Sequence, residues 1–246
     1  MMINALTSRF RLERGDSARE AEALRIMQER AEATRRAVLA AAAVLFEQHG
    51  YVGTSISDVA RTSGYTSGAI YFHFGSKEGL AEAVYDAHFA EWPRLVEKWN
   101  SLGGPVLERL VGLSLAVARE FRDNVIVRAG NRLSNESRSI STELPKPFVG
   151  WISTCTQLLA VAQENGELAP GTDVERAAHV VVASFSGTHT LSDALNNRRH
   201  VEQAVVDLWT LLLPGLQASP DPGGCLERAH SLLDRPPAPR APSPGR

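Results

Sequence analysis

The sequence is poor in cysteine and has no long hydrophobic run. Cys155 and Cys225 are its only cysteines in 246 residues, and they are far apart in unlike contexts. Neither has metal-ligand spacing, so we expect two free thiols, Cys155 buried on a helix and Cys225 in a loose C-terminal tail. No apolar run reaches the roughly 18 to 20 residues that a membrane-spanning helix needs.

The N-terminus lacks the features of a secretory signal. Its opening residues, MMINALTSRFRLERGD, contain no hydrophobic stretch followed by a small-residue cleavage site. We therefore expect a cytoplasmic protein without membrane association. The net charge of −2 argues against nucleic-acid binding by the whole surface, but it leaves room for a locally basic face.

Motifs for catalysis are missing as well. The sequence has no paired-histidine metal motif and no phosphate-cradling glycine loop, so we expect no metal ion and no cofactor. The segment nearest to a nucleophile elbow, Ala183 to Gly187, has Phe185 where the serine should be. These absences predict that the chain is not an enzyme.

Helical periodicity dominates what is present, and it predicts an all-α fold. Ser17 and Glu20 have capping-box spacing and predict a helix over 17–30, which we expect to be a solvated extension. A second helix should run from about Ala31 to His49, with Gly50 as its left-handed stop. Glycine, proline and asparagine breakers then separate helices expected at about 77–99, 105–121, 124–135, 147–165, 173–195 and 201–216. The chain beyond Leu216 holds seven of the thirteen prolines, so we expect it to be disordered.

The strongest local pattern runs from Thr54 to Lys77, TSISDVARTSGYTSGAIYFHFGSK. Ser55 and Thr66 can cap two short helices joined at Gly64, which is the pattern of a helix-turn-helix. The second helix of such a pair can enter a DNA major groove about 12 Å wide. Periodicity alone favours a plain helical hairpin whose aromatic residues are only core, because such hairpins are common in all-α domains.

The polar side chains of this segment suit a DNA backbone. Hydroxyl, ring and ammonium donors to phosphate oxygens are available from Ser55, Thr66, Tyr71, His73 and Lys77. Gly68 and Ala69 lack bulk, so the backbone there can approach base edges or a thymine methyl group. Ile70 and Phe74 are expected in the core.

The segment resembles the head of the TetR family of bacterial regulators, whose pattern is roughly T-x-x-x-I-A-x-x-A-G-V-S-x-G-x-L-Y-x-H-F-x-x-K-E-x-L. The residues in matching places are Ser55, Val59-Ala60, Gly64, Thr66, Gly68, Ile70-Tyr71, His73-Phe74, Lys77-Glu78 and Leu80. The resemblance covers about 50 residues, and Ser63 and Tyr65 depart from it. It implies a partner of double-stranded DNA, with Tyr71, His73 and Lys77 on phosphates and Thr66, Ser67, Gly68 and Ala69 facing bases.

The rest of the chain resembles one branch of that family, the γ-butyrolactone and butenolide hormone receptors. Five motifs carry this resemblance in order: Tyr71-Phe72-His73-Phe74, Arg128 to Leu133, Pro147 to Trp151, Glu164 to Leu168 and Phe185 to Thr188. It implies a homodimeric repressor that binds a palindromic operator and is released by a lactone or butenolide ligand. Ser67 departs from the branch, which usually has lysine there, so a charged contact to guanine cannot be carried over.

The resemblance also implies an apolar pocket with few polar groups. In it Trp151 would pack over the lactone ring and Thr188 would donate a hydrogen bond. The remaining expected ligand contacts are Phe89, Phe148, Cys155 and Phe185 as apolar wall, with His88 or Ser134 as polar groups. Alternatives stay open: Trp151 as a core aromatic, His88 and Ser134 facing solvent or capping a neighbour, a pocket for another lipophilic molecule or none, and a helical hormone carrier without DNA binding.

Together these patterns divide the chain into four parts. They are a partly helical extension, a helix-turn-helix domain, a ligand-binding and dimerisation domain and a Pro-rich tail, at residues 1–30, 31–80, 81–216 and 217–246. We expect the dimer contact in the helices near 148–165 and 201–216. Their apolar residues beyond one core stripe include Leu158, Leu159, Val205, Trp209 and Leu212.

Overall fold

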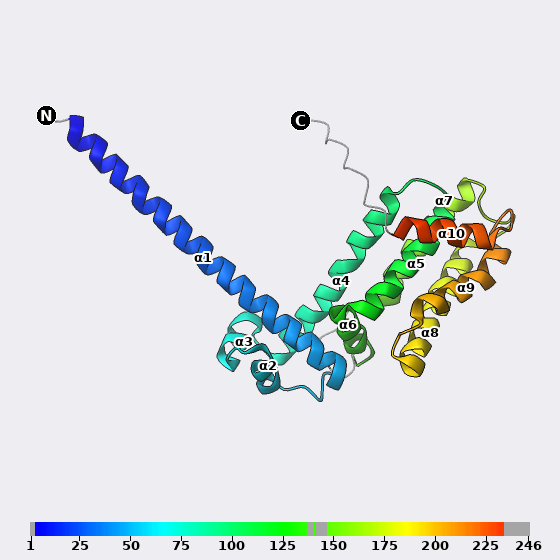
Figure 1. Cartoon of the computed structure of the whole chain (residues 1–246), viewed down its shortest axis with the longest axis horizontal. Helices are drawn as coiled ribbons and strands as arrows, with labels where there is room; N and C mark the ends of the chain where they lie inside the picture. The colour runs from blue at the N-terminus through cyan, green and yellow to red at the C-terminus, as the bar shows by residue number, and fades with distance from the viewer. Residues whose placement is uncertain (1–2, 137–139, 141–146, 234–246) are drawn as a thin grey trace.

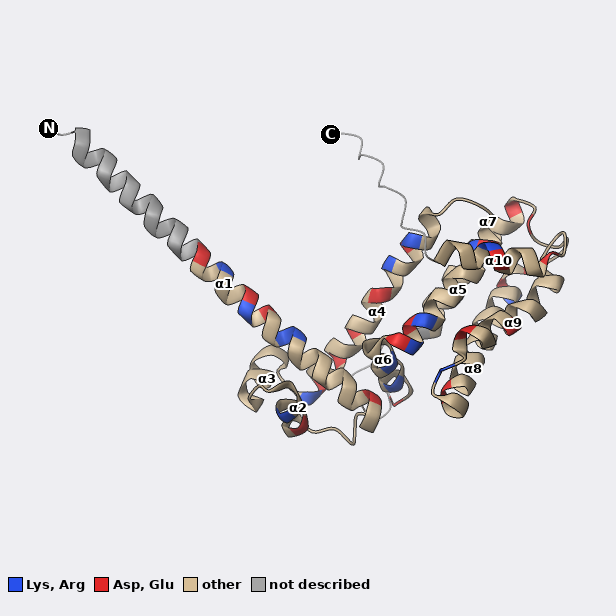
Figure 2. Ribbon diagram, viewed as in Figure 1, with Lys and Arg blue, Asp and Glu red and all other residues tan. Residues whose placement is uncertain are grey.

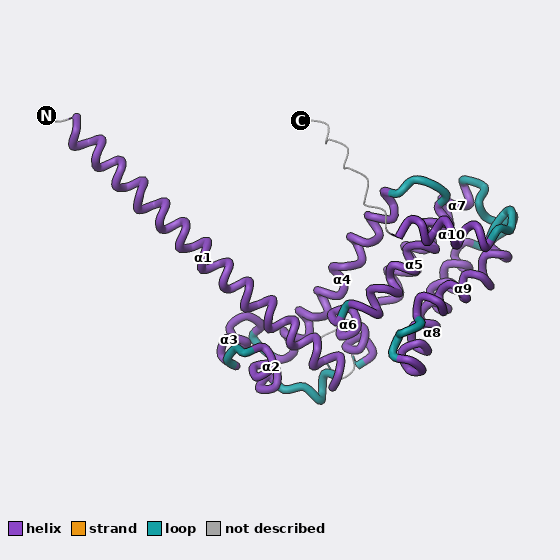
Figure 3. Tube along the Cα trace, in the orientation of Figure 1, coloured by secondary structure: helices purple, strands orange, loops and turns teal. Residues whose placement is uncertain are grey.

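The computed structural model describes residues 3–136, 140 and 147–233, with the side chains of residues 22–136, 140 and 148–233. These residues form helices joined mostly by short loops, and no strand occurs among them (Figures 1 and 3). The helices are α1 (Ile3–His49), α2 (Ile56–Ser63), α3 (Ser67–Phe74), α4 (Lys77–Ser101), α5 (Val106–Asp123), α6 (Val125–Asn135), α7 (Pro147–Glu164), α8 (Val174–Asn196), α9 (Val201–Leu216) and α10 (Pro222–Leu233). The all-α prediction is confirmed.

A small head contains the C-terminal part of α1, with α2, α3 and the start of α4, and α5 and α7 to α10 lie to one side of it (Figure 1). Its core side chains Phe46, Val59, Ile70 and Leu80 come from these four helices, and all are at most 1% exposed. Two residues of α6, Ala129 and Leu133, are buried in the same core. Because α6 belongs to the body in sequence, head and body share this packing.

The body surrounds α5, which contacts α4, α7, α9 and α10. Its largest fully buried side chains include Trp99, Leu115, Leu159 and Trp209. The long helix α4 begins in the head and runs into the body (Figure 1). No helix of the described residues is long and apolar enough to cross a membrane.

One continuous helix replaces the predicted break in α1. Instead of an extension over 17–30 followed by a helix from Ala31, the backbone is helical from Ile3 to His49. The sequence between Asp16 and His49 contains no glycine or proline to interrupt it. Arg25 also pairs with Glu22 and Glu29, each at 2.6 Å and at helical spacing. The continuous helix can be followed in Figure 1.

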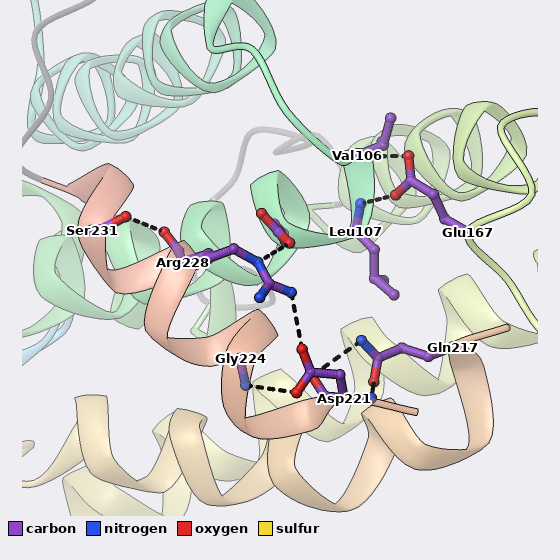
Figure 4. Close-up of polar contacts among 9 residues, drawn as sticks. Val106, Leu107, Glu167, Gln217, Asp221, Gly224, Arg228 and Ser231 are labelled. Atoms are coloured by element: carbon purple, nitrogen blue, oxygen red, sulfur yellow. Dashed lines mark hydrogen bonds and ion pairs between the residues drawn. The ribbon is translucent and has the colours of Figure 1, made fainter. Parts of the chain in front are cut away.

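The prediction of a disordered chain beyond Leu216 is wrong for residues 222–233, which form α10. Cys225 is 1% exposed there, so it lies in the body core rather than in a loose tail. Pro222 stands at the first helical position, where the missing N–H of proline costs no hydrogen bond. Asp221 Oδ1 accepts the amide of Gly224 at 3.0 Å, and Arg228 pairs with Glu108 of α5 (Figure 4). Residues 234–246 lie outside the described residues.

Three of the residues predicted for a dimer contact are fully buried within one chain. Leu159, Val205 and Trp209 have no exposed surface, so they hold the body together and cannot meet a partner. The amphipathic pattern predicted that one side of each helix is buried, which left these residues for a partner. In the structure α7 contacts α5 and α8, and α9 contacts α5, α8 and α10, so more than one side of each helix is buried. Apolar side chains of the body that do remain exposed lie on α7, α8 and α9. They are Phe148, Val149, Val161, Val180, Leu191, Leu195 and Leu211.

Candidate functional site

Side-chain caps fix both helices of the head's helix-turn-helix. Ser55 Oγ accepts the amide of Asp58 at 3.1 Å, and Asp58 Oδ2 accepts the amide of Ser55 at 3.2 Å, which completes a capping box. Thr66 Oγ1 accepts the amide of Ala69 at 3.2 Å and begins α3. Gly64 ends α2 in the left-handed region, with φ 76°. The Ser55 hydroxyl also donates to Asp58 Oδ2 at 2.6 Å, so its proton is already engaged.

The helix α3 presents only some of its predicted DNA contacts to solvent. Gly68 and Tyr71 are exposed, whereas Ser67, Ala69 and His73 are half-buried. Ile70 is fully buried, and Phe74 packs against the head core, as expected. The sequence reasoning missed Phe72, which is 84% exposed on this surface. Arg35 of α1 lies near the end of α3, with its guanidinium 5.4 Å from the centre of the Phe74 ring.

Lys77 begins α4, three residues after α3 ends. Its Nζ lies 4.2 Å from the centre of the Tyr51 ring, a cation–π contact that limits where the ammonium group can move. Tyr51 Oη in turn donates to Glu78 Oε1 at 2.7 Å. Burial, together with this carboxylate, raises the pKa of Tyr51 to about 12, so the phenol keeps its proton. Lys77 is therefore a positioned cation at the junction of α3 and α4.

A cavity lies in the body between α4, α5, α7 and α8. Its volume is about 80 Å³, and its wall is mainly apolar. Five of the predicted ligand contacts line it: His88, Phe148, Trp151, Cys155 and Phe185. These residues come from three helices, so the fold gathers them at one place.

Three predicted ligand contacts do not line the cavity. Phe89 packs between the head and body cores, with its ring 4.7 Å from that of Tyr85. Ser134 is hydrogen-bonded to Tyr85 instead. Thr188 is half-buried on α8, and the rotation of the helix turns Phe185, Ser186 and His189 into the cavity instead.

The cavity wall contains a chain of aromatic rings that the sequence reasoning missed. Trp92 lies edge-on to His88 at 5.0 Å and to Trp151 at 5.4 Å, and it stacks on Phe121 at 6.0 Å. Phe121 stacks on His189. The available signal was helical spacing, because His88 and Trp92 are four residues apart, as are Phe185 and His189.

The polar groups of the cavity are few and uncharged. Among the described residues that line the cavity, two buried side-chain atoms lack a hydrogen-bond partner, Nδ1 of His88 and Nε1 of Trp92. Burial lowers the pKa of His88 and of His189 to about 4, so both imidazoles are neutral near pH 7. Burial raises the pKa of the Cys155 thiol to about 12, which keeps it protonated and unreactive. No Lys, Arg, Asp or Glu is among the described residues that line the cavity.

Comparisons with known proteins agree with this geometry. The family model of bacterial regulatory proteins, tetR family, matches residues 38–84, and that of the tetracyclin repressor-like C-terminal domain matches residues 105–218. A solved structure described as the molecular basis for control of antibiotic production by bacterial hormones is 40% identical. It matches 75% of this chain and 98% of its own, with a TM-score of 0.70. The chain belongs to the tetR family.

Further relatives of this TetR-family regulator are two proteins named as receptors and one that is solved on its operator. The A-factor receptor protein of Streptomyces griseus is 36% identical over 77% of this chain and 66% of its own length, just under two thirds. A gamma-butyrolactone receptor (ArpA-like protein) structure is 30% identical, covers 83% of this chain and 98% of its own, and has a TM-score of 0.71. Streptomyces coelicolor CprB in complex with its operator sequence is 31% identical over 84% and 100% of the two chains, with a TM-score of 0.73.

The family assignment gives the two sites their coarse roles. This TetR-family protein is a DNA-binding transcriptional regulator whose head is the matched N-terminal region, and its relatives are regulators rather than enzymes. Among its described residues, no group of three or more His, Cys, Asp or Glu side chains could hold a metal ion. The family match of residues 38–84 sets aside the plain helical hairpin that periodicity alone favours.

Ion pairs connect the TetR-type head to the body at Glu47, near the end of α1. Arg128 of α6 reaches its Oε1 at 2.9 Å, and Arg198 of the α8–α9 loop reaches the same oxygen at 3.8 Å. Arg198 also pairs with Asp193 at 2.8 Å, and its side chain is only 14% exposed. Arg132 of α6 donates to the Glu47 carbonyl at 2.7 Å. Three body arginines therefore converge on one residue of the head.

Proposed function

We propose that this protein is a homodimeric repressor that binds a palindromic operator through α3 and is released by an uncharged lactone or butenolide. The observation that carries the proposal is that α4 takes part in both the DNA-binding head and the cavity wall. It begins with Lys77 beside α3 and contributes His88 and Trp92 to the cavity wall. One continuous helix thus belongs to both sites, as a ligand-controlled DNA-binding protein requires.

The chemistry of the cavity supports an uncharged, largely apolar ligand. A buried carboxylate or ammonium group would need a countercharge, and the described wall residues offer none. The neutral His88 presents Nδ1 as an unpartnered acceptor, and Trp92 presents Nε1–H as an unpartnered donor. A hydroxyl group can serve both, and a ring carbonyl can accept from Trp92. The relatives named as an A-factor receptor and a gamma-butyrolactone receptor point to the same ligand class.

The proposed dimer forms through α8 and α9, because Leu159, Val205 and Trp209 are buried within one chain. Leu195 and Leu211 are 80% and 81% exposed, and Leu191 is 62% exposed one turn before Leu195. α8 and α9 lie against each other, and each contributes exposed apolar side chains to the outside of the body. Isologous pairing of two chains through these side chains buries them and gives the two-fold symmetry of a palindrome. The paired variant Leu195→Glu with Leu211→Glu should sediment as a monomer, whereas a monomeric wild type at micromolar concentration contradicts the dimer.

Release by the ligand is proposed to act through α4 and α6. A Cβ atom at Gly130 of α6 would lie 2.4 Å from His88 Cβ, so only glycine allows this close contact of α6 with α4. α6 also places Ala129 and Leu133 in the head core. A ligand that shifts His88 or Trp92 therefore moves groups packed against the head. Such a ligand lowers the affinity for DNA if it binds better to the protein with His88 or Trp92 shifted than to the DNA-binding conformation.

A mobility-shift assay tests the proposal directly. The probe is duplex DNA from upstream of the gene itself, with a synthetic γ-butyrolactone, a butenolide and a carboxylate of similar size as added ligands. We expect a shifted complex that only the uncharged compounds dissociate. Binding to DNA without release by any of them indicates a regulator of a different ligand. Lactone binding without any DNA complex indicates the carrier alternative.

A further inference from the structure

The exposed face of α3 consists of a glycine followed one turn later by two aromatic residues. Gly68, Tyr71 and Phe72 are exposed and are spaced three and four residues apart, so they share one side of the helix. The opposite side carries the fully buried Ile70. At 84%, Phe72 has the largest exposed fraction among the large hydrophobic side chains of the described residues.

The fold requires neither the glycine nor the exposed ring. A Cβ atom at Gly68 would meet only Thr66 Oγ1, at an ordinary contact distance of 3.8 Å, and the backbone there is not in the left-handed region. Glycine inside a helix is less stable than alanine, and an exposed phenylalanine loses the free energy that burial would supply. Both features therefore serve a partner that lies against this face.

The chemistry of α3 restricts how it can read a base. Its sequence, SGAIYFHF, contains no Lys, Arg, Asp or Glu, and its ribbon is free of charge colouring in Figure 2. Bidentate recognition of guanine by Arg or Lys is therefore unavailable from this helix. The major groove offers one apolar feature for recognition, the 5-methyl group of thymine.

We propose that Phe72 is a specificity-determining residue that packs against a thymine methyl group in each operator half-site, while Gly68 lets the α3 backbone approach the groove floor. The inference rests on the proposed binding of a palindromic operator by α3. Lys77 and Tyr71 hold phosphates, which fixes the helix in register but carries no sequence information. Phe72 supplies the sequence preference that these backbone contacts lack.

The test starts with selection of bound duplexes from a random-sequence pool by the wild-type protein. We expect thymine at one position of each half-site. Phe72→Ala should lower affinity for the selected duplex about tenfold and abolish the thymine preference at that position alone. Its affinity for unselected DNA and its salt dependence should equal those of the wild type, because no phosphate contact is lost. Unchanged helicity and melting temperature are expected, since the ring is exposed.

Replacing the selected thymine by deoxyuridine removes only the methyl group. This change should weaken wild-type binding about fourfold, the effect of one buried methylene-sized group, and should not weaken Phe72→Ala further. Phe72→Leu is the matched control and should keep part of the thymine preference. Equal weakening of all duplexes by Phe72→Ala, or full wild-type affinity for the deoxyuridine duplex, would overturn the role of Phe72. If the wild type selects no sequence at all, the proposed operator binding fails, and this inference fails with it.

Discussion

The rings of Phe121 and His189 stack with their centres 4.2 Å apart and their planes 16° from parallel. This contact joins α5 to α8, and Trp92 extends the stack to α4. His189 lies on the helix that ends just before Arg198, which pairs with Glu47 of the head. The cavity wall is therefore connected to the head by two routes, along α4 and along α8.

Trp151→Ala tests the cavity as the site of ligand control. The side chain lies half-buried against Trp92 and away from α3, so operator affinity should stay within about twofold of the wild type. Loss of the indole should weaken binding of a lactone by roughly 1 to 3 kcal/mol, because an aromatic contact surface disappears. The measurements are a mobility shift for DNA and calorimetry for the lactone. Thr188→Val is the control and should bind ligand normally, since Thr188 does not line the cavity. Release of DNA from Trp151→Ala at the wild-type ligand concentration would place the pocket elsewhere.

Lys77→Ala tests the phosphate contact of the head. Removing one phosphate-bound cation should weaken binding to every duplex alike and reduce the slope of log affinity against log salt by about one. Anisotropy titrations at four salt concentrations give both quantities. Lys98→Ala is the matched control, because Lys98 lies at the other end of the same helix. An unchanged salt slope in Lys77→Ala would remove the residue from the DNA surface.

The buried histidines predict a loss of stability in mild acid. The pKa of His88 and of His189 is about 4 in the fold, against 6.5 in an unfolded chain. A lowered pKa means that the neutral form is favoured in the fold, so the stabilisation is complete above pH 6.5 and is lost as the pH falls toward 4. At pH 5 the loss is about 2 kcal/mol for each group, measured as a lower urea midpoint.

Variants separate this effect from general acid unfolding. His189→Phe keeps a ring against Phe121 but cannot titrate, so its urea midpoint should fall less between pH 7 and pH 5 than that of the wild type. His200→Gln is the control, because His200 is exposed, and its pH dependence should match the wild type. Equal pH dependence of all three proteins would show that His189 is not held neutral by burial.

Arg198→Ala tests the second route from cavity to head. The substitution removes the contact of the α8–α9 loop with Glu47 but leaves Arg128 on that carboxylate. Ligand affinity should change little, whereas the ratio of DNA affinities without and with ligand should fall at least fivefold, because about 1 kcal/mol of coupling disappears. Arg199→Ala is the matched control, since its side chain is exposed. If the ratio of DNA affinities without and with ligand is unaltered in Arg198→Ala, the cavity is coupled to the head through α4 and α6 alone.

Local sequence features predicted the head well because short-range chemistry decides it. Ser55, Thr66 and Gly64 begin and end their helices through contacts within four residues, and the structure has each in its predicted role. Helix ends in the body also agree with prediction to within about two residues from α4 to α9, because glycine, proline and asparagine breakers act locally.

Only the tertiary structure decided which side of each helix is covered, and most wrong predictions have this cause. Trp209 and Leu159 were expected at a dimer contact, yet α5 and its neighbours enclose them completely. Cys225 and the rest of α10 have no strong local signal, but α5 offers them a core and Glu108 an ion pair with Arg228. Thr188 and His189 are adjacent in sequence, and only the rotation of α8 against α5 turns His189, not Thr188, into the cavity. Periodicity fixes the relative positions of side chains on one helix, whereas the faces that become buried depend on packing between segments far apart in the chain.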